Sequence, residues 1–311
     1  MVVYPGVLAS ALHGLVEFFQ AANAWSDAEG ASFSLRCWLD SRARVSLPDQ
    51  IQLVSETDST PHVVVVPPGS NEPASDVACP ELKAWLANAA GEGALLASAC
   101  VGAYVLAESG LLNGRTVTTH WLLADAFRRR FQGVRVDEEQ ALLIDGDVVT
   151  AGGVTAWVDL AVHLVSRLGS PELAMRLSGY FLLDTAQREQ RYYRIFAPTV
   201  KHGDAPIEKA QRWLLEHHHE PVDLDALSRE VGLGARTFQR RFLAATSLAP
   251  GAYLQRLRIQ QACVLLATTD QSVESVVWSV GYRDISAFRR LFKERVGLTP
   301  SAYRDRFYLS R

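Results

Sequence analysis

The last hundred residues of the chain carry one sequence pattern twice, fifty positions apart. Residues 238–242 read FQRRF and recur at 288–292 as FRRLF, and residues 248–253 read LAPGAY and recur at 298–303 as LTPSAY. An internal repeat of this kind marks one supersecondary unit that the chain uses more than once. Each copy predicts a helix, a tight turn and a second helix bearing arginines, which is typical of a helix-turn-helix unit whose second helix enters a DNA major groove. The repeat therefore predicts an all-α, DNA-binding module.

Cap residues and apolar spacing set the expected helix bounds in both copies. Asp223 and Ser272 are expected to cap the first helices, and Gly232 and Gly281 to end them with a positive φ. The second helix of the first copy is predicted over 235–245, with its two phenylalanines facing a core at i, i+4. The arginines left outside either keep a helical bundle soluble or read bases, and their common register in both copies favours base reading, since Arg chelates guanine and Gln adenine. The residues left outside are Arg236, Thr237, Gln239, Arg240 and Arg241 in the first unit and Ser286, Arg289, Arg290 and Lys293 in the second.

Three further features of this module have competing interpretations. Asp284 opens the second recognition helix, where a carboxylate either accepts from cytosine N4 or, as we favour, caps the helix. Residues 252–267 lack Gly and Pro and predict one long helix, a rigid connector that would let the recognition helices enter major grooves about one DNA turn (~34 Å) apart. The triplet 217–219, HHH, is interpreted as a helix end and not as a metal site, because consecutive helical side chains diverge by about 100°.

Charge is distributed unevenly along a chain whose net charge is only −3. Residues 205–311 carry 16 Lys and Arg against 11 Asp and Glu, whereas residues 1–204 carry 15 against 23. A basic module beside an acidic remainder suits nucleic-acid binding by the smaller part. No apolar run is long enough to cross a bilayer, and the N-terminus lacks a secretory pattern. Four widely spaced cysteines predict neither disulfides nor a zinc site, which favours a reducing cytoplasm.

The C-terminal part of the module carries a recognisable set of residues: Val280-Gly281-Tyr282, Phe288, Phe292-Lys293, Gly297-Leu298-Thr299-Pro300 and Tyr303-Arg304. On this signature, residues 206–308 resemble the AraC/XylS family of transcriptional regulators. The resemblance implies that the base-reading side chains are Arg236, Gln239 and Arg240 in the first unit and Ser286, Arg289 and Arg290 in the second, to which we add Thr237 as a candidate DNA-binding residue. It also implies that the partner is the double-stranded DNA of a promoter operator, and RNA polymerase is a further candidate partner.

Residues 1–185 alternate short apolar runs with helical stretches. Strands that are continuously apolar, and not alternating, predict a parallel sheet covered on both faces. The expected fold class is therefore α/β, an open flavodoxin-like parallel sheet, followed by the all-α module. The predicted strands are 1–4, 33–39, 63–66, 94–99 and 115–118, and the predicted helices are 15–24, 80–90, 101–109, 122–131 and 156–168.

One cysteine lies at a predicted strand-to-helix elbow. Cys100 ends the strand 94–99, and a helix begins at Val101. A helix N-terminus favours a thiolate, and the arrangement is that of a nucleophile elbow. His120 follows the next strand, reaches the same sheet edge and is a candidate base. Cys100 is thus a catalytic thiol, part of a ligand pocket or a small core residue.

Together with His120, this elbow resembles the class I glutamine-amidotransferase-like superfamily that includes the ThiJ/PfpI proteins. Supporting matches are 66–69, Glu17-Phe18 and 145–156. Joined to the AraC-type module, the architecture resembles the GlxA-type regulators, which implies a homodimer whose N-terminal domain senses a small-molecule effector. The candidate ligand-binding residues are Cys100, His120, Gly69, Val101 and Glu17.

Active hydrolases of that superfamily carry an acidic residue just ahead of the first helix, and residues 10–14, SALHG, contain none. We therefore expect no enzymatic activity, no cofactor and no metal. The expected organisation is a sensor domain over 1–185, a linker over 186–205 and a DNA-binding domain over 206–311. One alternative is a thiol-dependent, amidase-like hydrolase fused to the DNA-binding domain, which a carboxylate beside Cys100 would favour. Another is a DNA-binding protein without a ligand, which a filled pocket at Cys100 would favour.

Overall fold

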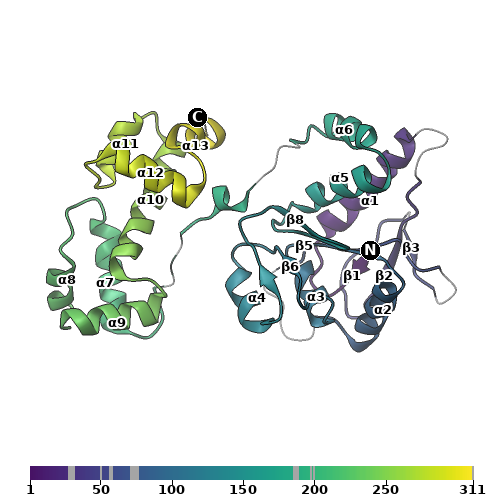
Figure 1. The fold of residues 1–311 in the computed structure, drawn as a ribbon, viewed down its shortest axis with the longest axis horizontal. Helices are drawn as coiled ribbons and strands as arrows, with labels where there is room; N and C mark the ends of the chain where they lie inside the picture. The colour runs from purple at the N-terminus through teal and green to yellow at the C-terminus, as the bar shows by residue number, and fades with distance from the viewer. Residues whose placement is uncertain are drawn as a thin grey trace. The chain divides into compact units, whose positions relative to one another are not determined.

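The computed structural model describes residues 1–26, 32–49, 51–55, 59–70, 77–184, 189–196, 198 and 200–309. The chain forms two compact units, Met1–Gln190 and Arg191–Arg311. Figure 1 labels helices and strands of both units. Within the ranges given above, none of the helices combines the length and the apolar character that a membrane crossing needs.

Short, mostly parallel strands form the middle layer of the first unit (Figure 1). β1, β2 and β3 pair in parallel, as do β4, β5 and β9, and β6 pairs in parallel with β7. The predicted parallel sheet is confirmed, with the addition of β8, which runs antiparallel to β9 and which the apolar runs do not predict. The strands are β1 (Val2–Val3), β2 (Arg36–Leu39), β3 (Gln52–Leu53), β4 (Val63–Val66), β5 (Leu95–Ala99), β6 (Thr116–Val117), β7 (Arg135–Val136), β8 (Leu142–Asp145) and β9 (Val148–Ala151).

Helices cover both faces of this layer, as the continuous apolar strands predict. α1, α5 and α6 pack against one another on one face, and α2, α3 and α4 lie on the other (Figure 1). α1 begins earlier than the predicted 15–24. Position 14 within it requires a glycine, because the ring of Trp157 lies where a Cβ would be. The helices are α1 (Ala9–Trp25), α2 (Pro80–Gly91), α3 (Gly102–Glu108), α4 (Ala124–Arg130), α5 (Trp157–Leu168) and α6 (Pro171–Tyr180), followed by a 3-10 turn at Gln190–Tyr193.

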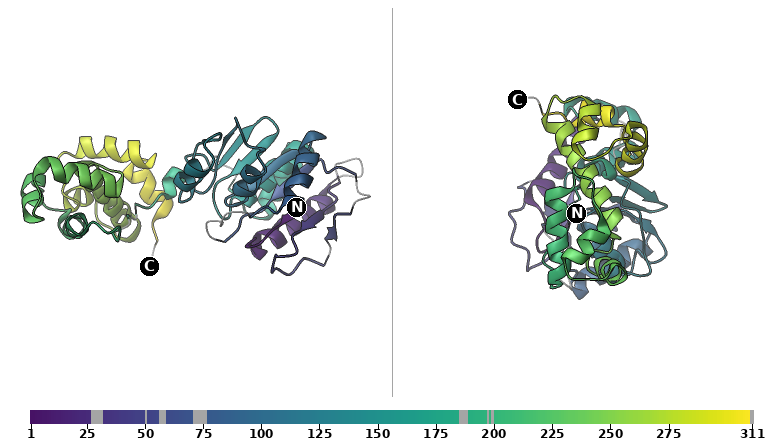
Figure 2. Two further views of the ribbon diagram at one scale, coloured as in Figure 1. Left: turned by 90° about the horizontal axis from the view of Figure 1, so that it is seen from below. Right: turned by 90° about the vertical axis from the view of Figure 1, so that its left-hand side faces the viewer.

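The described part of the second unit is entirely helical. α8 and α9 form the first helix-turn-helix unit, α11 and α12 form the second, and α10 runs from one to the other (Figure 1 and Figure 2). Asp223 and Ser272 cap α8 and α11 as predicted, and Gly232 and Gly281 follow these helices at φ values of 75° and 85°. The helices are α7 (Ala205–His217), α8 (Leu224–Glu230), α9 (Ala235–Thr246), α10 (Pro250–Thr268), α11 (Val273–Ser279), α12 (Ile285–Val296) and α13 (Pro300–Phe307).

The elbow between β5 and α3 depends on one close backbone approach. Gly102 begins α3 directly beside the end of β4. A Cβ on Gly102 would lie 2.4 Å from the carbonyl oxygen of Val66 and 2.9 Å from that of Pro67. Because both neighbours are backbone atoms, a side chain here cannot be accommodated by a rotamer change.

We expect Gly102→Ala to destabilise the protein by roughly 1–3 kcal/mol, the usual cost of overpacking a core. The matched control is Gly91→Ala at the end of α2, where no atom lies within 4 Å of the added Cβ. The control should change stability by less than about 0.5 kcal/mol. Urea unfolding of the full chain, followed by circular dichroism, measures both, and equal midpoints for the two variants would contradict the close approach.

Candidate functional site

The recognition helix α9 buries one face and exposes the other. Phe238 and Phe242 are fully buried, with ring centroids 5.5 Å apart. Because these two residues are one helical turn apart and share a face, the two positions directly after Phe238 lie away from the core. Arg236, Gln239 and Arg240 are all exposed, and Thr237 is half-buried.

The recognition helix α12 repeats this arrangement with two differences. Ser286 and Arg290 are exposed, whereas Arg289 forms an ion pair of 2.7 Å with Glu274 of α11. The carboxylate of Glu274 therefore competes with an external anion for the guanidinium of Arg289. The second difference is Asp284, whose carboxylate accepts a hydrogen bond of 2.9 Å from the Ala287 amide. This confirms that Asp284 is the helix cap.

Arg241 lies on the same helix as Arg240 but has a structural partner. Its guanidinium donates two hydrogen bonds of 2.9 and 2.7 Å to the carboxylate of Asp204, which also caps α7. The bonds from Arg241 lower the pKa of the Asp204 carboxyl below its usual value. Neither Arg240 nor Arg290 forms an ion pair within the described part of the chain, so their charges remain available to an external anion.

The expected elbow at Cys100 is present, and its thiol is buried. Cys100 has a φ of 53°, a strained conformation for a residue with a side chain, and it is 2 % exposed. Burial raises the pKa of the thiol to about 11, against a smaller opposite effect of the Val101 amide. The expectation that the helix N-terminus favours the thiolate is therefore wrong, because the loss of hydration outweighs it.

A tyrosine fills the space beside this elbow. Tyr4 is 1 % exposed, and its hydroxyl donates a hydrogen bond of 2.8 Å to the carbonyl oxygen of Pro67. Its pKa is raised, first by burial and second by Cys100 close by. Gly69 is packed against the same ring, because a Cβ there would lie 2.8 Å from the Tyr4 hydroxyl. Cys100, Val101 and Gly69 are thus brought together around a space that protein atoms already occupy.

The structure does not pair His120 with Cys100 within its described ranges. The Nδ1 atom of His120 faces the Leu122 amide at 3.2 Å, and burial lowers the pKa of the ring. The contact that reaches the elbow comes from Thr119, whose hydroxyl donates a hydrogen bond of 2.8 Å to the Cys100 carbonyl. Glu17 is exposed on α1, where it lines a small groove of about 170 Å³ with His13 and other residues. It does not join Cys100.

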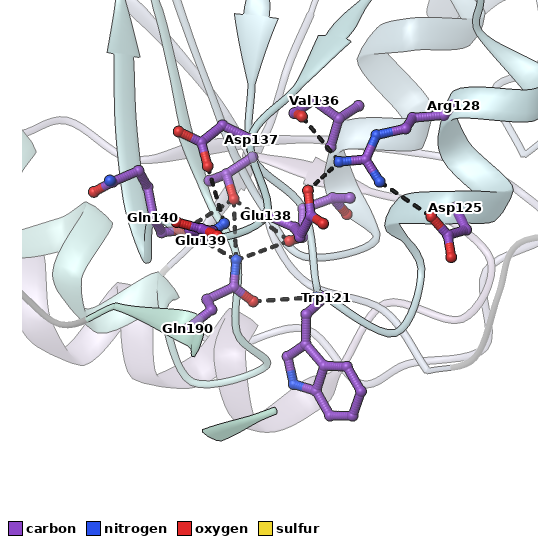
Figure 3. Close-up of polar contacts among 11 residues, drawn as sticks. Trp121, Asp125, Arg128, Val136, Asp137, Glu138, Glu139, Gln140 and Gln190 are labelled. Carbon is purple, nitrogen blue, oxygen red and sulfur yellow. Dashed lines mark hydrogen bonds and ion pairs between the residues drawn. The ribbon is translucent and has the colours of Figure 1, made fainter. Parts of the chain in front are cut away.

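A buried amide near His120 was not predicted from the sequence. Gln190 is 4 % exposed, and its side-chain nitrogen donates hydrogen bonds of 3.0 Å to the Thr118 hydroxyl and 2.9 Å to the carbonyls of Thr119 and Gln140. Its side-chain oxygen accepts from the Trp121 amide at 3.2 Å (Figure 3). A glutamine in a charged stretch without periodicity carries no local signal for this role. The last residue of the first unit is thus tied to the segment that follows β6.

A large cavity lies at the other edge of the strands. It has a volume of about 1100 Å³, and Arg36, His62 and Val63, at or next to the starts of β2 and β4, line it. Cys100 follows the last residue of β5, so the cavity and the elbow lie at opposite ends of parallel strands. Apolar side chains from three helices and β2 also line it, among them Phe19, Trp38, Trp85 and Leu164, and serine and threonine side chains of the segments before β2 and β4 add polar groups.

Comparison with known families divides the chain in the same way. Residues 41–167 match the DJ-1/PfpI family, and residues 227–306 match a family described as a helix-turn-helix domain. The chain is 32 % identical to the HTH-type transcriptional regulator CdhR of Pseudomonas aeruginosa over 71 % of its own length and 66 % of that protein. It is 26 % identical to the HTH-type transcriptional regulator GlxA of Rhizobium meliloti over 66 % and 63 % of the two chains. The chain thus spans just under two thirds of the length of these curated relatives.

A solved structure supports the α/β architecture. A transcriptional regulator protein from Vibrio parahaemolyticus superposes with a TM-score of 0.50 at 17 % identity, covering 58 % of this chain and 96 % of that one. At this identity the likeness concerns the fold alone.

The burial of Cys100 predicts slow alkylation. With a pKa of about 11, the thiol should react with iodoacetamide at pH 8 roughly a hundredfold more slowly in the native protein than after unfolding. Peptide mass spectrometry follows the rate, with the half-buried Cys79 as an internal comparison. The rate should rise with pH up to about pH 11. Fast labelling that is already constant near pH 7 would show an activated thiolate and contradict this view of the elbow.

Proposed function

The chain belongs to the AraC-family helix-turn-helix regulators that carry an N-terminal DJ-1/PfpI domain, and we propose that it regulates transcription by binding a promoter operator. In this proposal residues 206–311 bind double-stranded DNA, residues 1–185 sense a small molecule and hold two copies together, and residues 186–205 link the two domains.

The observation that carries the DNA-binding proposal is the matched pair of recognition helices. In both α9 and α12 a buried phenylalanine pair turns an arginine outward, Arg240 in one helix and Arg290 in the other. A guanidinium presented in this way can bond guanine O6 and N7 together. Arg236, Thr237, Gln239, Ser286 and Arg289 complete the proposed base-reading and phosphate-contacting set.

We propose that the first unit binds the effector, for which there are two candidate places. The elbow residues Cys100, His120, Gly69 and Val101 form the first, although Tyr4 already fills the space beside Cys100. The cavity of about 1100 Å³ is the second, and its volume favours it, because a bound molecule needs concave space lined by apolar groups with a few polar ones. Glu17, on the exposed side of α1, is the weakest of the candidate residues.

We further propose that the protein is a regulator without hydrolase activity. The groups that set the pKa of Cys100 are its burial and the Val101 amide, and within the described ranges no carboxylate or imidazole is among them. A buried neutral thiol without a base has no route to the nucleophilic thiolate. The absence of an acidic residue over 10–14 agrees with this.

Three exposed apolar side chains on and directly after α6 support dimerisation through the first unit. Met175 is 69 % exposed, Tyr180 is 61 % and Leu182 is 91 %. Large apolar side chains exposed on one short segment are candidates for an interaction site. A second copy bound there would raise the affinity for a symmetric operator through effective concentration.

Replacing Arg240 or Arg290 with Ala should weaken binding to the operator by about 1–3 kcal/mol, since each variant loses a bidentate base contact. An operator is first selected from random duplex DNA with the full chain, and affinities are then measured by fluorescence anisotropy. Wild-type binding should also fall steeply as salt is added. The control is Arg129→Ala, which removes the same charge from an exposed position on α4. Wild-type affinity in both test variants would refute the proposed recognition helices.

Effector binding should change operator affinity by about 1–3 kcal/mol, and DNA should change effector affinity by the same factor. A panel of amino acids, amines and organic acids is screened by thermal shift, because a ligand of the native state raises the apparent stability. Binders are then tested in operator titrations. Unchanged operator affinity with every binder would indicate that the first unit has become a dimerisation scaffold.

Two variants distinguish the candidate places. Asn88→Trp places a large ring at the rim of the cavity from an exposed position on α2, whereas His120→Ala alters the elbow segment. Loss of the effector response in Asn88→Trp alone assigns the cavity, and loss in His120→Ala alone assigns the elbow. Operator affinity without effector should be unchanged in both.

A further inference from the structure

The two helix-turn-helix units have separate hydrophobic cores that meet at one residue of α10. Leu254 and Leu257 belong to the core that holds Phe238 and Phe242. Ile259 and the residues after it belong to the second core. Arg258 lies between these two sets and belongs to neither. The apolar packing therefore fixes each unit on its own half of α10, but it does not by itself fix one unit against the other.

The guanidinium of Arg258 contacts both units at this seam. Its Nε atom donates a hydrogen bond of 2.7 Å to the carbonyl of His218, and one terminal nitrogen donates a bond of 2.8 Å to the carbonyl of Glu220. Both carbonyls lie at or just after the end of α7, where backbone acceptors lack partners within the helix and the helix dipole favours a cation. On the other side the guanidinium carbon lies 5.4 Å from the centroid of the Tyr282 ring, which belongs to the turn of the second helix-turn-helix unit.

A backbone contact joins the same two segments. Gly281 has a φ of 85°, and a Cβ there would lie 2.8 Å from the carbonyl oxygen of His219 and 3.0 Å from Arg258. The turn after α11 thus packs directly on the end of α7. Burial lowers the pKa of Arg258 somewhat, as expected for a cation held between two protein surfaces. The backbone of the histidine triplet 217–219 is therefore the segment against which the second helix-turn-helix unit packs.

We infer that Arg258 is a positioning residue that holds the two helix-turn-helix units at one separation. One chain then reads a composite DNA site made of two half-sites, one read by α9 and one by α12, with a fixed spacing between them. This inference rests on the proposed DNA binding. A planar guanidinium can bond two carbonyls with its edge while it stacks on a ring with its face, whereas a lysine ammonium cannot do both. Without this clamp, the packing of Gly281 on the carbonyl of His219 is left to hold the two helix-turn-helix units at this seam.

The consequence concerns spacing and not contact with bases. Inserting one base pair between the half-sites rotates one of them by ~34° and moves it by ~3.4 Å relative to the other. A rigid pair of recognition helices cannot follow this change, so wild-type affinity should fall by roughly tenfold or more, the scale of a mismatched base pair. A loosened pair should tolerate the insertion.

The test compares the full chain with Arg258→Lys, which keeps the charge, and Arg258→Met, which keeps the apolar stem. Each protein is titrated by fluorescence anisotropy with the selected operator, with operators lengthened or shortened by one base pair, and with a single half-site. Both variants should bind the single half-site like wild type and bind the composite operator less tightly. The spacing penalty is the factor by which affinity falls when one base pair is added or removed, and in both variants it should be close to one, which means no loss. The control is Arg256→Lys, on the same helix but outside the seam, which should keep the wild-type spacing penalty.

Two results separate the possible failures. If wild type selects no DNA sequence, the proposed function itself fails. If wild type selects an operator and shows a spacing penalty that both Arg258 variants retain in full, the proposed function stands and the clamp is refuted. Should the Arg258 variants fail to fold, Tyr282→Leu removes the stacked ring while both carbonyl bonds remain, and it should reduce the spacing penalty on the same probes. An unchanged penalty in that variant also overturns the inference.

Discussion

Burial of one phenylalanine pair in each helix-turn-helix unit determines which side chains of the recognition helices α9 and α12 are exposed. The rings of Phe238 and Phe242, and of Phe288 and Phe292, are fully buried, and each pair spans one helical turn. Once that face of α9 or α12 is inside, the residue two positions after the first phenylalanine lies on the opposite side of the helix. The outward position of Arg240 and Arg290 is therefore a result of core packing. Neither arginine forms an ion pair within the described residues, which leaves its charge available for an external anion.

The two helix-turn-helix units have two small hydrophobic cores instead of one large core. Each core stabilises its own recognition helix, and the long helix α10 is shared between them. Polar and backbone contacts at Arg258 and Gly281 then supply the connection that apolar packing does not. Such contacts are directional, since a hydrogen bond requires a particular distance and angle. They suit a seam whose purpose is to hold an orientation.

The first unit keeps the geometry of a nucleophile elbow around a buried thiol. Cys100 has a strained φ and Gly102 makes the close approach to β4, while Tyr4 occupies the neighbouring space and burial raises the pKa of the thiol. Concave space is found instead at the opposite end of the strands. On the elbow side, Thr119 and Gln190 link the Cys100 carbonyl to the last residue of the unit through buried hydrogen bonds. The elbow thus contributes to how the unit is held together.

The sequence by itself determined the features that depend on residues a few positions apart. Helix caps at Asp223, Ser272 and Asp284, the buried face of each recognition helix and the parallel apolar strands all follow from spacings of two to four residues, and the structure confirms them. Only the tertiary structure decided the properties that depend on distant neighbours. Burial beside Tyr4 set the pKa of Cys100, Glu274 and Asp204 engaged Arg289 and Arg241, and the end of α7 engaged Arg258. No local pattern encodes such partners, because each contact joins segments that approach one another only when the chain has folded.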